Sequence, residues 1–490
     1  MKPTKRFPLA IGAALTLAAC TAMAAGPAAN NEKVDQLTQR MDQLLQLVNQ
    51  LNAEVQTLKA ENQSLRKEQS QTQQGLQSTQ AAQAQMGSQV AETSVAVEKV
   101  QAQVQAQPAS HQLDNLSLWG YGEIYDMNPV HNSNLAQADL ARAVFGIGYR
   151  FDDKTRFNSE FEVEHGVASA SDVGEFEVEQ FYIDHTINPS VSLQAGLFLI
   201  PTGFLNENHE PTHFYGVQRN FVETLIIPST WREGGINLHG NTEDGLRWTV
   251  GLTTGQDISK WNFTPEFVPY QTALDLENNG YAPLQATHQE LSLAKSKHLA
   301  QFVSLDYSGV PGLRVGGSVF TSNMGSTMAG LPDERGTLWE THARYSPGNW
   351  QLSALYAQGT ISNTAAANSQ FPGTANPIPS RFDGWFVEAG YKLWESGDYK
   401  LTPFARYEHY NMGAGYEGLA PGFGPRPTGL FPTSNTPGSF GTYPYAYDDV
   451  STVGANFYLS SGVVFKVDYQ HFKVNSNFSR IDFGLGLAFE

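Results

Sequence analysis

The chain has 490 residues, a formal net charge of −18 and a single cysteine. The acidic balance argues against a nucleic-acid-binding protein, which needs a basic face, and the lone cysteine excludes an internal disulfide or a thiolate metal site. Beyond the N-terminus there is no run of about 18 apolar residues, so a helical membrane protein is excluded. A transmembrane β-barrel remains compatible with this composition, because alternating strands never produce a long apolar run.

Residues 1–24 have the features of a secretory signal peptide. A positively charged start precedes an apolar stretch over residues 7–19, and an A-x-A cleavage motif ends at Ala24. The motif that ends at Cys20 also resembles a lipobox, which would make this cysteine a lipidated N-terminus. We favour cleavage after Ala24, because a barrel that anchors the protein makes a lipid redundant.

Residues 31–67 keep a strict seven-residue hydrophobic repeat, which predicts an α-helical coiled coil and therefore an oligomer. The seam residues are Val34, Leu37, Met41, Leu44, Val48, Leu51, Val55, Leu58, Asn62 and Leu65. Valine paired with leucine leans towards two strands in isolated peptides, but a larger domain can fix the stoichiometry, so dimer and trimer both stay open. Residues 68–112 are rich in Gln, Ala and Ser and are predicted to be a tether.

From residue 113 to residue 490 the hydrophobic period changes to two, which is typical of strands between lipid and a wet lumen. Sixteen such segments begin near residues 116, 140, 155, 175, 190, 233, 245, 298, 312, 336, 349, 382, 399, 448, 462 and 478. The segment at 175–187 breaks phase between Val178 and Phe181, which predicts a β-bulge. The predicted fold is an all-β transmembrane barrel of 16 antiparallel strands, preceded by the α-helical coiled coil.

The connections between these segments alternate in length. Short turns follow the even segments, whereas the longest connections, at 200–232, 256–297, 361–381 and 411–447, follow odd ones. Bacterial outer-membrane barrels have short periplasmic turns and long outer loops. The pattern predicts a protein of the outer membrane, in contact with lipid and lipopolysaccharide, whose coiled coil lies in the periplasm and can reach peptidoglycan.

The phase of the predicted segments turns a set of charged residues towards the lumen. These are Arg142, Arg150, Arg156, Glu160, Glu162, Glu164, Arg247, Arg314, Arg344, Arg406 and Arg480. Opposed fixed charges in a pore orient dipolar solutes and filter ions by sign. The alternative for each residue is that it only satisfies a cross-strand partner.

The connection at 200–232 is the candidate constriction loop, because it is long and has enough apolar residues to pack inside the barrel. Its polar candidates are Asn206, Asn208, His209, Glu210, His213 and Arg219. The alternative is an ordinary extracellular loop. A metal pair at His209 and His213 is discounted because Pro211 disrupts the helix that this spacing needs, so neither a metal nor a cofactor is expected.

The chain resembles the coiled-coil-bearing trimeric porins, namely the phosphate-selective porin O and P family and the related DcaP-like dicarboxylate porins. The resemblance rests on the heptads, the opening strand Leu118–Glu123, the run Ala195–Phe198 followed by Pro201–Gly203, and the segment Trp231–Gly235. It implies a homotrimer with three separate pores.

This sequence departs from that family in two ways. Only eight lysines follow residue 110, whereas phosphate-selective members have pores rich in Lys and Arg, so phosphate selectivity is in doubt. Glu490 also follows the terminal aromatic residue Phe489, on which family members usually end.

The predicted function is passive diffusion of small hydrophilic solutes through an outer-membrane porin, with anionic, carboxylate-like solutes expected. Two alternatives are a structural envelope tether with a barrel anchor and a saccharide or polymer exporter. No enzyme is expected, because the chain has no G-x-S-x-G motif to position a serine nucleophile.

Overall fold

The computed structural model describes residues 59, 113–131, 133–167, 174–263, 282–372, 374, 376–419, 447–474 and 476–489. The chain divides into two compact units, residues 1–109 and 110–490. The predicted signal peptide, coiled-coil seam and tether lie outside the described residues; of residues 1–112 only Lys59 is described, and it is helical. In the described part of the chain no helix is long and apolar enough to span a membrane.

Strands dominate the second unit. They are β1 (Leu116–Pro129), β2 (Gln137–Arg150), β3 (Thr155–Glu164), β4 (Phe176–Asn188), β5 (Val191–Leu199), β6 (Arg232–Asn241), β7 (Leu246–Thr253), β8 (Ala300–Tyr307), β9 (Leu313–Gly325), β10 (Glu334–Tyr345), β11 (Trp350–Ile361), β12 (Pro379–Tyr391), β13 (Trp394–Ser396), β14 (Tyr399–Tyr416), β15 (Tyr447–Ser460), β16 (Val463–Phe472) and β17 (Arg480–Phe489). The helical elements are short: η1 (Leu113–Asn115), η2 (Ser133–Leu135), η3 (Val222–Ile226), η4 (Ile258–Lys260), η5 (Gln285–Thr287), α3 (Thr364–Asn368) and η6 (Ser476–Phe478).

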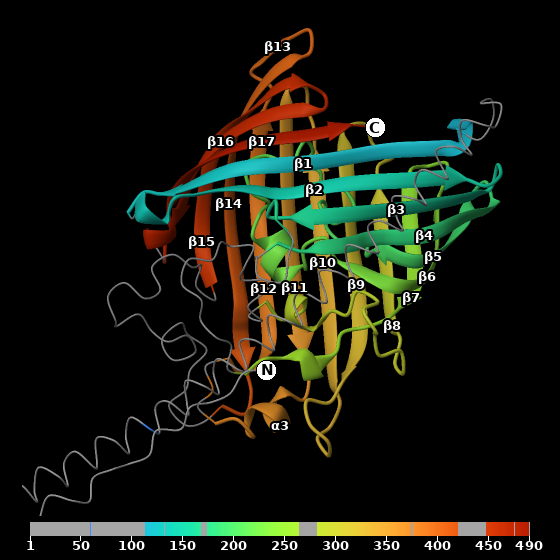
Figure 1. The fold of residues 1–490 in the computed structure, drawn as a ribbon, viewed down its shortest axis with the longest axis vertical. Helices are drawn as coiled ribbons and strands as arrows, with labels where there is room; N and C mark the ends of the chain where they lie inside the picture. Colours follow the sequence, from blue (N-terminus) through green and yellow to red (C-terminus); the bar gives the residue numbers. More distant parts are fainter. Residues whose placement is uncertain are drawn as a thin grey trace, which may run out of the picture. The chain divides into compact units, whose positions relative to one another are not determined.

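Sixteen of the described strands close into one antiparallel barrel. Each strand pairs with its neighbour in sequence, and β1 pairs with β17 as well as β2, which closes the ring (Figure 1). The remaining strand, β13, lies in the turn between β12 and β14 and pairs with β14 over three residues. The barrel itself continues from β12 directly to β14. The predicted 16-stranded barrel is confirmed.

The predicted strand positions agree with the structure, since all sixteen predicted starts lie within three residues of an observed strand start. The predicted bulge is also present. Opposite β3, Gln180 pairs with Glu160 and Val178 pairs with Phe161, so Glu179 is the extra residue. A bulge turns two successive side chains to one face, and here Glu179 and Gln180 both point inward.

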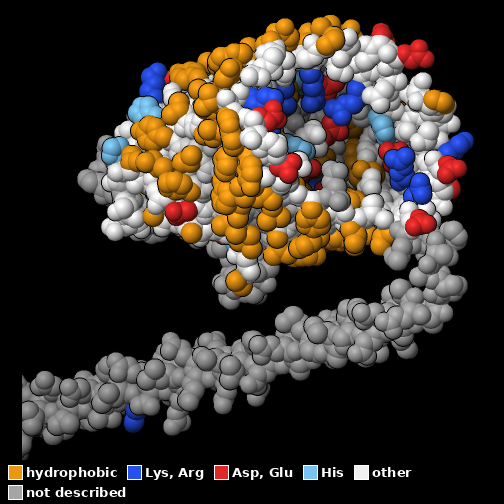
Figure 2. Space-filling view, turned by 90° about the horizontal axis from the view of Figure 1, so that it is seen from above, with side chains coloured by type: hydrophobic (Ala, Val, Ile, Leu, Met, Phe, Trp, Pro, Cys, Tyr) orange, Lys and Arg blue, Asp and Glu red, His pale blue; other side chains and the backbone are white. Residues whose placement is uncertain are grey.

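The alternation of side chains separates an apolar outer surface from a charged interior. Leu118, Phe145 and Phe181 are each more than half exposed on the outside, although they are large hydrophobic residues. Figure 2 shows hydrophobic side chains over the outer surface and charged side chains gathered in a hollow. Such a surface is stable when lipid covers it, as in an outer-membrane barrel.

Candidate functional site: the barrel lumen and its inward-folded loop

The charged residues predicted to face the lumen differ in exposure. Five are buried (Arg142, Glu160, Glu162, Arg406, Arg480), four are half-buried (Glu164, Arg247, Arg314, Arg344) and two are exposed (Arg150, Arg156). The two exposed arginines are register partners at the ends of β2 and β3, beside the short turn at 151–154. They lie away from the buried part of the wall, because a strand end next to a turn faces solvent.

The buried arginines are held by carboxylates. Arg406 Nε lies 2.9 Å from Glu408 Oε1 and its Nη1 lies 3.2 Å from Glu388 Oε2. Arg480 Nε lies 2.9 Å from Asp482 Oδ2. Buried charges of this kind require partners, because an unpaired ion inside the protein is strongly destabilising. For Arg406 and Arg480 the structure therefore supports the alternative interpretation, in which a charged residue only pairs with a neighbouring residue of the wall.

Three arginines remain partly open to solvent, and we call Arg247, Arg314 and Arg344 the arginine row. They project from β7, β9 and β10, and Arg314 and Arg344 are direct register partners. The side chains of Arg247 and Arg314 are 41% and 26% exposed. Asp306 on β8 contacts both of them, at 3.1 Å from Arg247 Nη2 and 2.7 Å from Arg314 Nε. Asp306 thus bridges two guanidinium groups, and Glu207 of the β5–β6 loop also lies 2.9 Å from Arg247 Nη2.

The loop between β5 and β6 starts from a closed neck. The backbone N–H of Ile200 donates to the carbonyl of Trp231 at 2.9 Å. Asn206 completes the neck, since its amide donates to the carbonyls of Ile200 and Trp231 and its Oδ1 accepts from the Trp231 N–H at 2.6 Å. The neck fixes the direction in which the loop leaves the wall.

From this neck the loop runs into the barrel and reaches the opposite wall. The N–H of Val217 donates to Asp468 on β16 at 2.6 Å, and the N–H of Phe221 donates to Glu408 on β14 at 2.6 Å. Phe204 packs beneath the arginine row, with the Arg344 guanidinium carbon 4.4 Å from its ring centroid. These contacts join segments about 190 to 250 residues apart and place the loop inside the lumen.

A buried carboxylate organises the loop itself. Glu223 in η3 accepts hydrogen bonds from the backbone N–H of Phe204 (2.5 Å) and Leu205 (2.8 Å) and from the Asn220 amide (2.8 Å). Burial raises the pKa of Glu223, and these donors oppose the rise by stabilising the ionised form. The Glu223 side chain thereby links the first part of the loop, at Phe204 and Leu205, to its later part, at Asn220.

The wall is shaped to receive η3. A Cβ atom at Gly384 of β12 would lie 3.0 Å from Ile226 and 3.3 Å from Val222, both of which are buried. The absence of a side chain at this position lets η3 approach the wall closely.

The predicted loop residues separate into two groups. Asn206, His209 and Arg219 are buried, whereas Asn208 and His213 are exposed and Glu210 is half-buried. His213 Nδ1 lies 2.7 Å from Glu210, while His209 Nε2 lies 2.6 Å from the hydroxyl of Tyr121 on β1. The two histidines therefore have different partners, and burial together with nearby Arg219 lowers the pKa of His209 to about 3.

The second long connection, between β7 and β8, places the charged residue Glu290 next to Arg232, the first residue of β6. Glu290 lies 2.9 Å from Arg232 Nη2 and 3.2 Å from His288 Nδ1. A polar cavity of about 250 Å³ adjoins them and is lined by several acidic residues of β3 and β4. Burial alone would raise the pKa of Glu290, but the contacts with His288 and Arg232 lower it to about 2.

Because Glu290 is ionised in this ion pair, we expect the connection between β7 and β8 to lose stability at acidic pH. A carboxyl group whose pKa is lowered on folding stabilises the folded state at pH values above its ordinary pKa of 4.5. This stabilisation is lost as the pH falls towards 2, the pKa of Glu290 in the folded protein. We expect a loss of about 3 kcal/mol of local stability across this range from linkage. Hydrogen exchange of residues 282–299 between pH 5 and pH 2 checks it, and Glu290→Gln should abolish the pH dependence. Equal protection at both pH values would contradict the prediction.

Sequence reasoning missed several inward residues, among them Asp306 of the wall, Glu223 of the loop, and the pair Glu179 and Tyr121. The Tyr121 hydroxyl lies 2.6 Å from His209 Nε2 and donates to Glu179 Oε2 at 3.0 Å. The phase break on β4 was the available signal for Glu179, because the extra residue of a bulge changes which side chains point inward. No sequence signal linked Tyr121 to a loop residue that lies 88 positions away.

Comparison with known proteins gives matches over most of the barrel. The family model described as phosphate-selective porin O and P matches residues 115–480. An uncharacterized protein of Aquifex aeolicus (strain VF5) is 30% identical over 321 residues, covering 62% of this chain and 68% of the relative.

Several solved porin structures are also similar at low identity. OmpF of Salmonella typhi in complex with daunomycin has 12% identity and a TM-score of 0.47, covering 76% of this chain and 98% of that one. The anion-selective porin of Comamonas acidovorans has 12% identity, a TM-score of 0.44 and coverage of 76% and 99%. The outer-membrane channel DcaP of Acinetobacter baumannii has 10% identity, a TM-score of 0.42 and coverage of 76% and 97%.

Proposed function

Because the chain belongs to the phosphate-selective porin O and P family and is an outer-membrane channel, we propose that it passes small hydrophilic solutes by diffusion and prefers carboxylate-like anions. The protein acts as a channel rather than as an enzyme. We further propose that it works as a homotrimer embedded in lipid and lipopolysaccharide, with its predicted coiled coil in the periplasm and in reach of peptidoglycan.

The observation that carries the anion preference is the arginine row. Arg247, Arg314 and Arg344 keep part of their surface open, while Arg142, Arg406 and Arg480 are buried in ion pairs. A solute in the lumen can reach only groups that are open to water. The accessible positive charge is therefore concentrated on β7, β9 and β10, and it supports attraction of anions to that side of the lumen.

The shape of the guanidinium group favours carboxylates among the anions. An arginine presents paired N–H donors that match the two oxygens of a carboxylate, and such bidentate contacts are stronger than a point-charge interaction. Asp306 already occupies this role between Arg247 and Arg314. A passing carboxylate would compete with Asp306 for the same donors, which supports weak binding and rapid release, as conduction requires.

The test is a measurement of ion selectivity in planar bilayers under a salt gradient. The wild-type channel should show a reversal potential of the sign expected for anions, and a dicarboxylate such as succinate should reduce the current. The double variant Arg314→Gln/Arg344→Gln should shift the reversal potential towards cation preference, because it removes two accessible positive charges.

The matched control is Arg150→Gln. Arg150 is an exposed arginine at the end of β2, it does not belong to the arginine row, and it donates a hydrogen bond to Asn115. This variant should keep the wild-type reversal potential. A cation-preferring wild-type channel, or equal shifts in the control and the double variant, would refute the assignment of selectivity to the row.

A further inference from the structure

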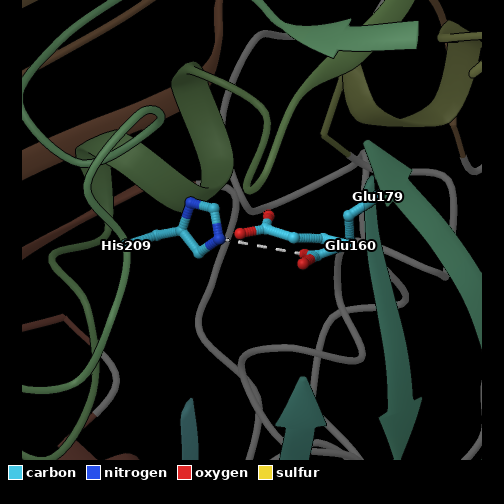
Figure 3. Close-up of side chains that lie close together, drawn as sticks. All are labelled: Glu160, Glu179 and His209. Atoms are coloured by element: carbon cyan, nitrogen blue, oxygen red, sulfur yellow. Dashed lines mark ion pairs between the residues drawn. The ribbon is translucent and has the colours of Figure 1, made fainter. Parts of the chain in front are cut away.

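Three buried side chains from separate elements converge beneath the inward-folded loop. Glu160 of β3, Glu179 of β4 and His209 of the loop each place a ligand atom within 4.8 Å of the others. Their exposed fractions are 7%, 0% and 3%. Figure 3 shows the His209 ring directed at the two carboxylates, and His209 Nε2 lies 3.9 Å from Glu179 Oε1.

The tautomer of His209 leaves a lone pair facing this cluster. His209 Nδ1 lies 3.1 Å from the backbone carbonyl of Asn206, which can only accept a hydrogen bond. Nδ1 therefore carries the hydrogen, and Nε2 of the neutral ring is an acceptor. A carbonyl that orients a histidine in this way is the usual support of a metal-binding imidazole.

The hydrogen bonds around the cluster contain too few donors. The Tyr121 hydroxyl lies 2.6 Å from His209 Nε2 and 3.0 Å from Glu179 Oε2, but it has one hydrogen to donate. Glu179 Oε1 is buried without a hydrogen-bond partner among the described residues. At least two acceptors of the cluster therefore face one another without a hydrogen between them.

Among the described residues, neither carboxylate of the cluster has a cationic side chain in direct contact. Glu160 accepts from the Trp119 indole at 2.6 Å and from the Gln180 amide, both neutral donors. In the described part of the chain neither Glu160 nor Glu179 forms an ion pair with a lysine or an arginine. The nearby Glu162 adds a further carboxylate beside Glu179, and its own cationic neighbour is Arg142 at 3.8 Å. A buried carboxylate is strongly disfavoured without a compensating positive charge.

We propose that Glu160, Glu179 and His209 bind one divalent transition-metal ion, of the class of Zn²⁺, that fastens the inward-folded loop to β3 and β4. One imidazole nitrogen and two carboxylates form a donor set suited to zinc, and the Tyr121 hydroxyl or a water completes four ligands. The ion supplies a positive charge in direct contact with the two carboxylates, whereas the nearest arginines, Arg142, Arg219 and Arg232, act on the cluster without an ion pair to either of them. The site goes beyond solute passage, since its role is to hold the loop in place.

The bulge of β4 makes this arrangement possible. Glu179 is the inserted residue, so it points inward next to Gln180 instead of outward towards lipid. Zinc bonds of about 2.1 Å place tetrahedral ligand atoms about 3.4 Å apart, so the three groups must draw together by roughly 1 Å. Because His209 belongs to a loop, it can make this movement without altering strand register.

The proposal is tested on the full-length, tag-free trimer or monomer as purified. The protein is stripped with EDTA, exposed to ZnCl₂, separated from free metal by gel filtration, and its zinc content is measured by mass spectrometry. We expect one zinc per chain and a higher thermal midpoint with zinc than with EDTA. Glu179→Gln and His209→Gln should each lose the bound zinc and the zinc-dependent shift.

His213→Gln is the matched control, because this exposed histidine of the same loop contacts Glu210 and not the cluster. It should retain the zinc. Retention of zinc by Glu179→Gln and His209→Gln, or absence of zinc from the wild type, would overturn the proposal. Preferential retention of Ca²⁺ or Mg²⁺ over Zn²⁺ would overturn the transition-metal class.

A second measurement on the wild type does not depend on the folding of variants. Co²⁺ in a four-coordinate, tetrahedral site gives visible absorption bands that are much stronger than those of octahedral aqueous Co²⁺. The stripped wild-type protein should develop these bands with one equivalent of Co²⁺ and lose them on addition of Zn²⁺. Failure to develop them would count against the site, and a shared proton between Glu162 and Glu179 would then explain the unpaired carboxylates.

Discussion

Replacing residues 203–229 by a short glycine-serine link is expected to raise the single-channel conductance severalfold. The loop crosses the lumen and bonds to β14 and β16 on the far wall, so it occupies space that water and ions would otherwise fill. A 16-stranded barrel without such a loop encloses an aqueous channel. Asp468 and Glu408, which lose their backbone donors, would then be hydrated by the water that enters. Conductance in planar bilayers measures the effect.

The control shortens another connection, residues 326–333 between β9 and β10, whose hydrogen bonds go to the nearby residues Glu334, Asn323 and Asn363, and it should leave the conductance unchanged. Far-ultraviolet circular dichroism should show the same strand content in both variants. An unchanged conductance after removal of residues 203–229 would mean that this loop does not limit the current.

Glu223→Ala is expected to have the largest effect of any single substitution in the loop. It removes the acceptor of the Phe204 and Leu205 backbone N–H groups and of the Asn220 amide, all of which are buried. An unsatisfied buried donor costs about 1–3 kcal/mol, so the loss of the acceptor for three donors should cost the loop roughly 3–9 kcal/mol of local stability. Greater hydrogen exchange across residues 203–229 and a noisier open-channel current would report this loss.

Asn208→Ala provides the comparison for this substitution, because Asn208 is an exposed polar residue of the same loop. Its hydrogen exchange and current noise should match those of the wild type. If Glu223→Ala also matched the wild type, the carboxylate would not be the brace that its hydrogen bonds indicate.

The sequence was sufficient to predict the barrel because the required information is local. A strand between lipid and water must alternate apolar and polar side chains. Segments such as Ile481–Phe489 can therefore be recognised as strands without knowing which strands they pair with. Turn lengths added the direction of each strand. Even the bulge at Glu179 left a local signal, since the phase of the alternation changed between Val178 and Phe181.

The arrangement inside the lumen was less predictable because it depends on contacts between distant segments. Arg314 and Arg406 have the same local pattern, yet Arg314 is partly open whereas Arg406 is buried beside the Tyr215 carbonyl of the loop. The difference follows from the path of the loop, which no strand pattern encodes. Likewise, the sequence analysis discounted a metal pair of His209 with His213 because of Pro211 but offered no partner for His209, which the fold brings to Tyr121 and Glu179.

The heptad seam from Val34 to Leu65 lies outside the described residues, so the coiled coil and its stoichiometry stay predictions. The arginines at the ends of β2 and β3 show a limit of a different kind. Arg150 and Arg156 have the predicted phase, but phase does not tell how close a residue is to the end of its strand.

The inserted residue of β4 shows how the interior of such a cylinder can acquire new chemistry. A substitution exchanges one inward group for another, whereas a one-residue insertion adds a group and leaves the rest of the ladder undisturbed, as the regular pairing on both sides of Glu179 demonstrates. The lipid-facing belt keeps its continuity, since Val178 and Phe181 still point outward. Short insertions are therefore a route by which related channels can diversify their inner walls without having to rebuild their envelope-facing surface.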